Sequence, residues 1–231
     1  MSTSLLALAI LPVIVLIYYV YQADKVEKEP MGLLIKLVIL GACTCLSALI
    51  LEILFGAVLD ALVSPASELY ILLENFLVVA VSEEIGKYFV LKKVTWNNKE
   101  FNYCFDAIVY AICVGLGFAL LENILYVSDG GFSVAISRAL LAIPGHAVDA
   151  VFMGYFYGLA KKAAYLGRFD RAERNRHLAL WVPVLIHGFY DYCLSTSYDL
   201  AIVLFFIFIV VMDIFAIRRI KASSREDSQV A

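Results

Sequence analysis

Long apolar segments separated by short polar connections constrain this chain more than any other feature of its sequence. A helix needs roughly 20 mostly apolar residues to cross the hydrocarbon core of a bilayer. The segments that meet this requirement are residues 4–21, 32–58, 69–91, 104–127, 133–160, 178–196 and 199–217. The sequence therefore predicts an all-α polytopic membrane protein, a bundle of about seven transmembrane helices in which the first segment is retained.

The distribution of basic residues predicts the orientation of this bundle. Lys and Arg occur in the connections after the first, third and fifth segments and after the seventh. The connections after the second, fourth and sixth segments contain neither residue. Because positive charge resists translocation, basic connections stay in the cytoplasm. We therefore expect the N-terminus outside and the C-terminus in the cytoplasm.

Composition agrees with a membrane protein and limits the domain organisation. Hydrophobic residues make up 63% of the chain and charged residues only 17%, whereas about 25% are charged in a typical soluble domain. The connections are short, so we predict one transmembrane domain over residues 1–220. Residues 221–231 are polar and are predicted to be a disordered cytoplasmic tail. The net charge of −3 gives no indication of nucleic-acid binding.

Ionisable residues inside the apolar segments are the strongest functional signal. Such residues are costly in a bilayer and usually mark a functional site. Those that we select, with their polar neighbours, are Glu83, Glu84, Lys87, Glu122, Asn123, Tyr126, His146, His187 and Asp191. A single buried ion pair is often structural, but several clusters in one small bundle predict a shared cavity. We interpret Glu52, Glu74 and Asp213 as structural, and Asp106 and Arg138 as interfacial anchors.

Helical spacing indicates which of these side chains are neighbours. Residues four apart lie on one face of a helix, so Glu83 and Lys87 should be in contact, and Lys87 can also reach back to Glu84. His187 and Asp191 have the same spacing, which would allow the carboxylate to fix the tautomer of the imidazole. Adjacent carboxylates near a histidine suit general acid–base activation of water.

Motif patterns exclude most other ways of cleaving a peptide bond in a membrane. The sequence has no His-Glu-x-x-His zinc motif, no Gly-x-Gly-Asp motif of aspartyl dyads and no Gly-x-Ser-x-Gly nucleophile motif. The five cysteines form no Cys-x-x-Cys pair, which argues against a zinc ribbon or a redox pair. A glutamate–histidine arrangement remains. Because Glu and His are also zinc ligands, a metal stays an open alternative.

The polar motifs resemble those of a known family. The motif series is Glu83-Glu84-x-x-Lys87, Gly117-Phe118-Ala-x-x-Glu122-Asn123-x-x-Tyr126, His146 and His187-Gly-x-x-Asp191, with Asp24, Glu29-Pro30 and Asp106-x-Ile-Val-Tyr110. It is similar, in order and over most of the chain, to the PrsW family of glutamic-type intramembrane proteases. That family belongs to the superfamily of the CAAX prenyl endopeptidases, whose first motif is usually Glu-Glu-x-x-x-Arg. Lys87 lies one position earlier, which makes prenyl-protein processing doubtful.

The resemblance implies an intramembrane endopeptidase, with Glu83, Glu84, His146 and His187 as catalytic residues. Glu83 or Glu84 would activate the water, and His146 or His187 would stabilise the oxyanion or protonate the leaving amine. The supporting residues would be Lys87, Glu122, Asn123, Tyr126 and Asp191. The best-known role of the family is the first cleavage of a membrane-anchored anti-sigma factor in stress signalling.

Cofactors, partners and location follow as expectations. No cofactor motif is visible, so we expect none. The expected partners are the lipid bilayer and a membrane-anchored protein substrate, and the expected location is the plasma membrane of a bacterium or archaeon. Buried carboxylates and histidines also relay protons in carriers, so a proton-coupled transporter is the main alternative, followed by a non-catalytic scaffold or receptor.

Overall fold

The computed structural model describes residues 2–230, and every regular element among them is a helix. The elements are α1 (Thr3–Ala23), α2 (Met31–Leu62), α3 (Glu68–Leu73), the π-helix η1 (Glu74–Ala80), α4 (Val81–Thr95), α5 (Asp106–Ser137), the π-helix η2 (Arg138–Ala142), α6 (Ile143–Tyr165), α7 (Phe169–Ser195) and α8 (Asp199–Arg225). The predicted all-α class is confirmed.

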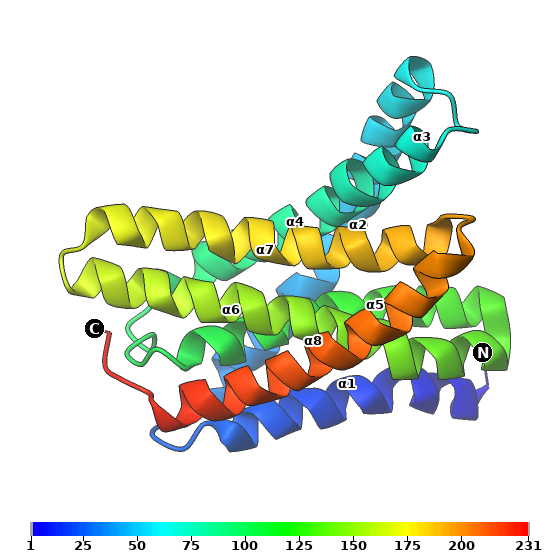
Figure 1. Cartoon of the computed structure of the whole chain (residues 1–231). Coiled ribbons are helices and arrows are strands. Elements are labelled where there is room, and N and C mark those ends of the chain that lie inside the picture. The colour runs from blue at the N-terminus through cyan, green and yellow to red at the C-terminus, as the bar shows by residue number, and fades with distance from the viewer. Residues whose placement is uncertain (1, 231) are drawn as a thin grey trace.

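Within residues 2–230, five stretches of helix are long and apolar enough to cross a membrane. They are α1, α2, the continuous stretch from α5 to α6 (Asp106–Tyr165), α7 and α8. The stretch Asp106–Tyr165 contains a turn at Gly131, where φ is 71° and ψ is −151°, and α6 returns along α5 (Figure 1). Residues 68–95 are divided among α3, η1 and α4. The chain is thus polytopic, while the count of seven and the orientation of the termini stay predictions.

Close helix contacts place α5 at the centre of the bundle. This helix packs against α1, α2, α4 and α6, and its first fourteen residues, 106–119, are all buried. A Cβ atom added to Gly41 of α2 would lie 2.1 Å from the carbonyl oxygen of Val114, and one added to Gly117 would lie 2.2 Å from that of Val38. Small residues allow such close approach of helices in membranes.

Two predicted boundaries are wrong. Helix α7 begins at Phe169 and not near residue 178, so basic residues assigned to a loop lie on the polar first turns of this helix. Helix α8 continues to Arg225 and so includes the first residues of the predicted tail, whose disorder stays a prediction. The backbone amide of Val230 donates to the carbonyl of Asn102 at 2.8 Å, and Asp227 accepts from the amide of Phe105 at 2.9 Å. These contacts hold the tail against the loop before α5.

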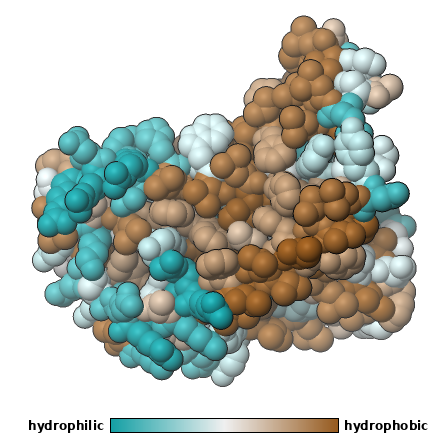
Figure 2. All heavy atoms as spheres, viewed as in Figure 1, coloured by the Kyte–Doolittle hydropathy of each residue, from teal (hydrophilic) through white to brown (hydrophobic). Residues whose placement is uncertain are grey.

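The surface has the distribution of polarity that a bilayer requires. Large apolar side chains are exposed along α2 and α8, for example Leu46, Ile53, Phe206 and Ile207. Figure 2 shows a broad hydrophobic area over α8 on the viewed face, with hydrophilic residues gathered at the end where the C-terminus lies. Apolar patches of this extent mark contact with a membrane or a partner.

Candidate active site

Both acidic and histidine motifs begin where a π-helix changes into an α-helix. The π-helix η1 ends at Ala80, three residues before Glu83. The second π-helix, η2, ends at Ala142, four residues before His146. π-Helical turns are rare and frequently occur at functional sites. Because each turn widens the helix, it shifts the register of the residues that follow, and it thereby sets which way Glu83 and His146 point.

Lys87 of α4 contacts Glu83 and Glu84 of the same helix and His146 of α6. Its Nζ atom lies 2.9 Å from Glu83 Oε2 and 2.7 Å from Glu84 Oε1, and 3.4 Å from His146 Nδ1. The ammonium also lies 3.9 Å from the centre of the Phe118 ring. The contacts predicted between Lys87 and both glutamates are confirmed. All three charged side chains are at least 93% buried, so their charges are compensated inside the bundle and not by water.

His187 lies between carboxylates from three helices. Its Nδ1 atom is 3.0 Å from Glu84 Oε1 and 3.5 Å from Asp149 Oδ2. Its Nε2 atom is 3.1 Å from Asp191 Oδ2 and 3.8 Å from Glu83 Oε2. The predicted contact between His187 and Asp191 is confirmed. A protonated ring can donate from both nitrogens, so this environment suits an imidazolium.

His146, on α6, also contacts a neighbouring network of side chains from α5 and η2. The Nε2 atom of His146 lies 2.9 Å from Glu122 Oε2. Arg138 donates to the same oxygen of Glu122 at 2.6 Å, and to Asn123 Oδ1 at 2.9 Å. The Arg138 guanidinium also lies 4.2 Å from the centre of the Tyr126 ring. The two imidazole rings are 5.5 Å apart, so the two networks form one site.

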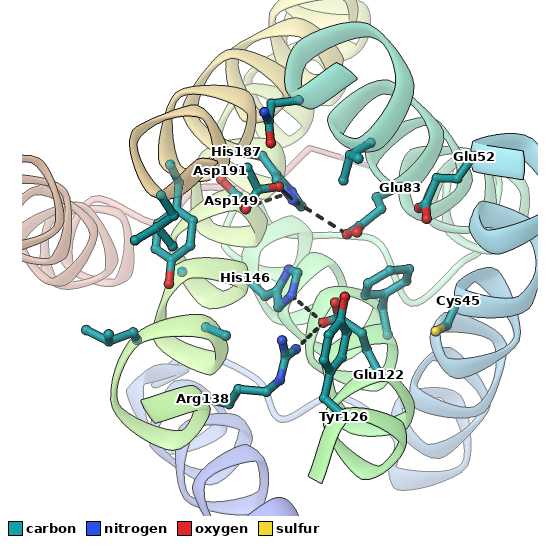
Figure 3. A pocket seen from close by; sticks show the side chains of 18 of the residues that line it. Cys45, Glu52, Glu83, Glu122, Tyr126, Arg138, His146, Asp149, His187 and Asp191 are labelled. Carbon is teal, nitrogen blue, oxygen red and sulfur yellow. Dashed lines mark hydrogen bonds and ion pairs between the residues drawn. The ribbon is translucent and has the colours of Figure 1, made fainter. Parts of the chain in front are cut away.

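A cavity of about 610 Å³ opens onto this site. Figure 3 shows the labelled side chains of Glu83, Glu122, His146 and His187 pointing toward a common space from α4, α5, α6 and α7. Tyr126 and Asp191 also line the cavity, whereas Glu84, Lys87 and Asn123 do not. The structure thus brings all nine predicted site residues together, six of them on the wall of the cavity and three behind it.

Three further residues of this site were not predicted. Arg138, interpreted as an interfacial anchor, forms the ion pair with Glu122. Asp149 contacts His187, and Glu52, interpreted as structural, lines the cavity. Helical spacing could have identified Asp149, which is three residues after His146, whereas Arg138 reaches Glu122 only through the turn at Gly131. Glu52 carries no such signal, since its position depends on how α2 leans against the other helices.

Comparison with known proteins now identifies the family. A family model described as PrsW family intramembrane metalloprotease matches residues 29–217. The chain belongs to the PrsW family. Curated PrsW proteases from Oceanobacillus iheyensis and Geobacillus kaustophilus are both 34% identical to it, over 94% and 83% of this chain and 95% and 80% of their own length. The PrsW protease of Bacillus subtilis is also 34% identical, over 83% of each chain.

Membership of the PrsW family makes this chain a membrane protease. No solved structure matches it, so the geometry of the site is taken from its own side chains. The resemblance to this family that the motif series indicated is confirmed, as are the hydrolase and membrane assignments that followed from it.

The word metalloprotease in the family description raises the question of whether the site fits a metal ion. Glu83, Glu84, His146 and His187 each offer one ligand atom, and these atoms lie within 4.8 Å of one another. By type they are zinc ligands. However, the Lys87 ammonium is 2.7, 2.9 and 3.4 Å from three of the four residues. A divalent ion and this ammonium repel each other and cannot share that space, so the site in this conformation does not fit a metal.

Proposed function

We propose that this PrsW family member is a glutamic-type intramembrane endopeptidase, in which Glu83 is the general base that activates water. The observation that carries the proposal is the different placement of the two adjacent glutamates. Glu83 lines the cavity, where a water and a peptide can reach it. Glu84 is 0% exposed, lies behind the cavity wall and is bound by Lys87 and His187. Glu84 therefore has the position of a supporting residue.

The reaction follows from groups on the wall of the cavity. Glu83 takes a proton from water as the water oxygen bonds to the scissile carbonyl carbon. His146 and His187 lie on the cavity wall beside Glu83 and are the donors available to the developing oxyanion. The carbon–nitrogen bond then breaks as the oxyanion re-forms a carbonyl and the proton that Glu83 took from water passes to the leaving amine. Asp191 holds the ring of His187 through Nε2, and Lys87 compensates the charge of Glu84.

Substrate binding is assigned to the network on α5 and η2. Glu122 and Tyr126 line the cavity, and Asn123 supports them from behind through Arg138. Arg138 itself reaches the cavity wall and can donate to a peptide carbonyl. In this proposal the network positions the substrate backbone, while the chemistry takes place beside Glu83.

The apolar residues of the cavity wall favour a substrate that arrives through the membrane. Several of its wall residues are apolar and exposed on the outside of the bundle, among them Leu46 at 53%, Leu125 at 47% and Leu194 at 49%. In a bilayer these side chains contact lipid, so the opening is accessible to a membrane-spanning segment. We propose a membrane-anchored protein as the substrate, an anti-sigma factor as its first candidate, and the plasma membrane as the location.

A cleavage assay with paired variants tests this assignment. Purified enzyme in lipid would be mixed with single-span substrates, and Glu83→Gln would be compared with Glu173→Gln, a carboxylate on the exposed part of α7. We expect Glu83→Gln to abolish cleavage with unchanged thermal unfolding, and Glu173→Gln to cleave like the wild type. Full activity of Glu83→Gln would refute the role of Glu83. Failure of the wild type to cleave any substrate would count against the protease assignment itself.

A chelator that prefers transition metals tests the metal-free chemistry. Phenanthroline offers aromatic nitrogen ligands and removes zinc in preference to magnesium, since nitrogen ligands suit zinc and oxygen ligands suit magnesium. We expect cleavage by the wild type to continue in its presence. Loss of cleavage, with recovery on adding zinc, would show that a metal replaces the Lys87 ammonium in the active enzyme.

A further inference from the structure

A second group of buried carboxylates lies at the N-terminal end of α5, about four helical turns before Glu122. Asp24 is the C-cap residue of α1, Glu29 lies two residues before the start of α2, and Asp106 is the first residue of α5. Each offers a carboxylate oxygen, and these oxygens lie within 4.8 Å of one another. The three residues are only 1%, 3% and 1% exposed. We call these three residues the acidic cluster.

The acidic cluster has no direct ion pair with a protein cation, and Lys28, which lowers the pKa of Asp24, is the one cation that acts on that carboxylate among the described residues. Among residues 2–230, no Lys, Arg or His nitrogen lies within 4.0 Å of these carboxylates. The nearby ammonium of Lys28 donates to the backbone carbonyls of Tyr21 and Asp24 instead. Asp227 in the tail adds a further negative charge beside the cluster. Buried carboxylates are normally paired or bound to a metal.

Asp24 provides the independent sign of a missing ligand. Both of its carboxylate oxygens are buried and have no hydrogen-bond partner among the described residues. The amides of Val26 and Glu27 lie close enough to lower its pKa, but neither makes a hydrogen bond of normal geometry with it. Oxygen Oδ1 of Asp106 is also buried and without a partner. The unsatisfied oxygens thus belong to two carboxylates whose ligand atoms lie within 4.8 Å of each other.

The remaining oxygens of the cluster are held in place by the protein. Oxygen Oδ2 of Asp106 accepts from the backbone amides of Asn102 and Tyr103 at 3.1 and 2.7 Å. Glu29 Oε2 accepts from the hydroxyl of Tyr110. These bonds orient the carboxylates before any ligand arrives, as partners of metal ligands do. Burial raises the pKa of Asp24 to about 6 and that of Glu29 to about 7, so protons are the competing occupants.

We propose that the acidic cluster binds one hard divalent cation, Mg²⁺ or Ca²⁺, at a structural site separate from the candidate active site. Three carboxylates offer only oxygen, which these cations prefer. A separation of up to 4.8 Å is about twice the metal–oxygen distance of 2.3–2.6 Å for Ca²⁺. The cation would join the α1–α2 connection to the start of α5, next to the loop that holds the C-terminal tail.

Terbium luminescence provides a direct test in the full-length protein in detergent. Tb³⁺ is a luminescent substitute for Ca²⁺ that is excited through nearby tyrosines, and Tyr110 contacts Glu29. We expect saturable emission that excess Ca²⁺ or Mg²⁺ displaces. Asp24→Asn should weaken Tb³⁺ binding at least about tenfold, the loss caused by removing even an outer partner of a metal ligand. Apart from weak contacts with the amides of Val26 and Glu27 and the attraction of Lys28, this substitution removes no favourable interaction of the carboxylate with the described residues.

Two matched variants exclude other sources of emission. Asp60 also contacts a tyrosine hydroxyl, that of Tyr70 at 2.7 Å, and Asp60→Asn should leave the emission unchanged. Glu84→Gln alters the candidate active site and should leave it unchanged as well. Emission that survives in Asp24→Asn, or is lost in Glu84→Gln, would overturn the proposal. A failure of the protease assay would not affect this result.

A second measurement covers the case in which Asp24→Asn does not fold. Thermal unfolding of the wild type, stripped with EDTA, would be followed against increasing Mg²⁺ or Ca²⁺, with NaCl of equal ionic strength as the control. Binding to the folded state alone raises the unfolding temperature. We expect a saturable increase with the divalent cations only. No increase, or an equal increase with NaCl, would show that the cluster holds protons and not a cation.

Discussion

At the scale of single residues, the buried lysine is the feature on which the candidate site depends. Lys87 is 2% exposed and has Glu83, Glu84 and His146 within 3.4 Å. Removing one partner of a buried ion pair lowers stability by about 3–5 kcal/mol, because the other charge stays buried and uncompensated. The ammonium therefore has two roles, since it permits two adjacent carboxylates to be buried and fills the space that a metal would need.

The first prediction concerns this lysine. We expect Lys87→Met to lower the free energy of unfolding by about 3–5 kcal/mol, because Glu83 and Glu84 lose the ammonium that they share and, among the described residues, only His187 remains beside them. The double variant Lys87→Met, Glu84→Gln should recover part of this loss, which unfolding in detergent by denaturant would measure. If the single and double variants are equally unstable, Glu84 is not the residue that Lys87 compensates.

Helical spacing explains how much of the site could be predicted at this scale. Contacts within one helix, such as Lys87 with Glu83 and His187 with Asp191, follow from spacing alone and are confirmed. Contacts between helices do not follow, because they depend on the turn at Gly131 and on the two π-helices. Arg138 was therefore interpreted as an anchor, although the turn at Gly131 brings it back to Glu122.

At the scale of helices, the close contact between α2 and α5 sets the shape of the cavity. Both Gly41 and Gly117 lie against backbone of the opposite helix, and backbone cannot move aside as a side chain can. Glu52 and Cys45 of α2 and Glu122 of α5 line the cavity further along the same pair of helices. Any change in the separation of the two helices would therefore move one cavity wall relative to the other.

The second prediction tests this contact. We expect Gly117→Val to cost at least about 1–3 kcal/mol of stability, the usual range for overpacking, and to reduce cleavage by displacing α2. Gly56→Val is the matched control, since nothing lies within 4 Å of a Cβ at Gly56. Thermal unfolding and cleavage rate of both variants would be compared. Equal behaviour of the two would show that α2 can shift without consequence.

Helix ends were less predictable than helix interiors, for two physical reasons. The first turns of α7 are polar and basic, so hydropathy alone ends the apolar segment at residue 178 although the helix begins at Phe169. The segment after α8 is polar too, and its contacts with residues 102–105 join positions that are distant in the sequence. Neither the polar start of α7 nor the contacts of the segment after α8 produce a periodic hydrophobic pattern in the sequence.

At the scale of the whole molecule, the size of the cavity limits what can be cleaved. An α-helix with its side chains is about 10–12 Å wide and rises 5.4 Å per turn. One turn therefore fills about 400–600 Å³ by the same dimensions, which is comparable with the cavity of about 610 Å³. A substrate helix cannot enter intact over several turns, and its carbonyls are hydrogen-bonded within it.

The third prediction follows from this limit. Substrates with helix-breaking residues near the scissile bond should be cleaved faster than matched substrates with Ala or Leu there, because Gly costs about 1 kcal/mol and Pro about 3 kcal/mol in a helix. A series of single-span substrates that differ at one position would be assayed for kcat/KM. Equal rates across the series would show that unwinding does not limit cleavage.

If the exposed apolar wall residues Leu46, Leu125 and Leu194 contact lipid as proposed, they also have a consequence for pharmacology. A small-molecule inhibitor would reach the cavity from the hydrocarbon phase, so its effective concentration is set by how it partitions between water and lipid. Apolar compounds accumulate in that phase. Their apparent potency will therefore depend on the amount of lipid or detergent in the assay, and inhibitors of this enzyme should be ranked by their concentration in the membrane rather than in the buffer.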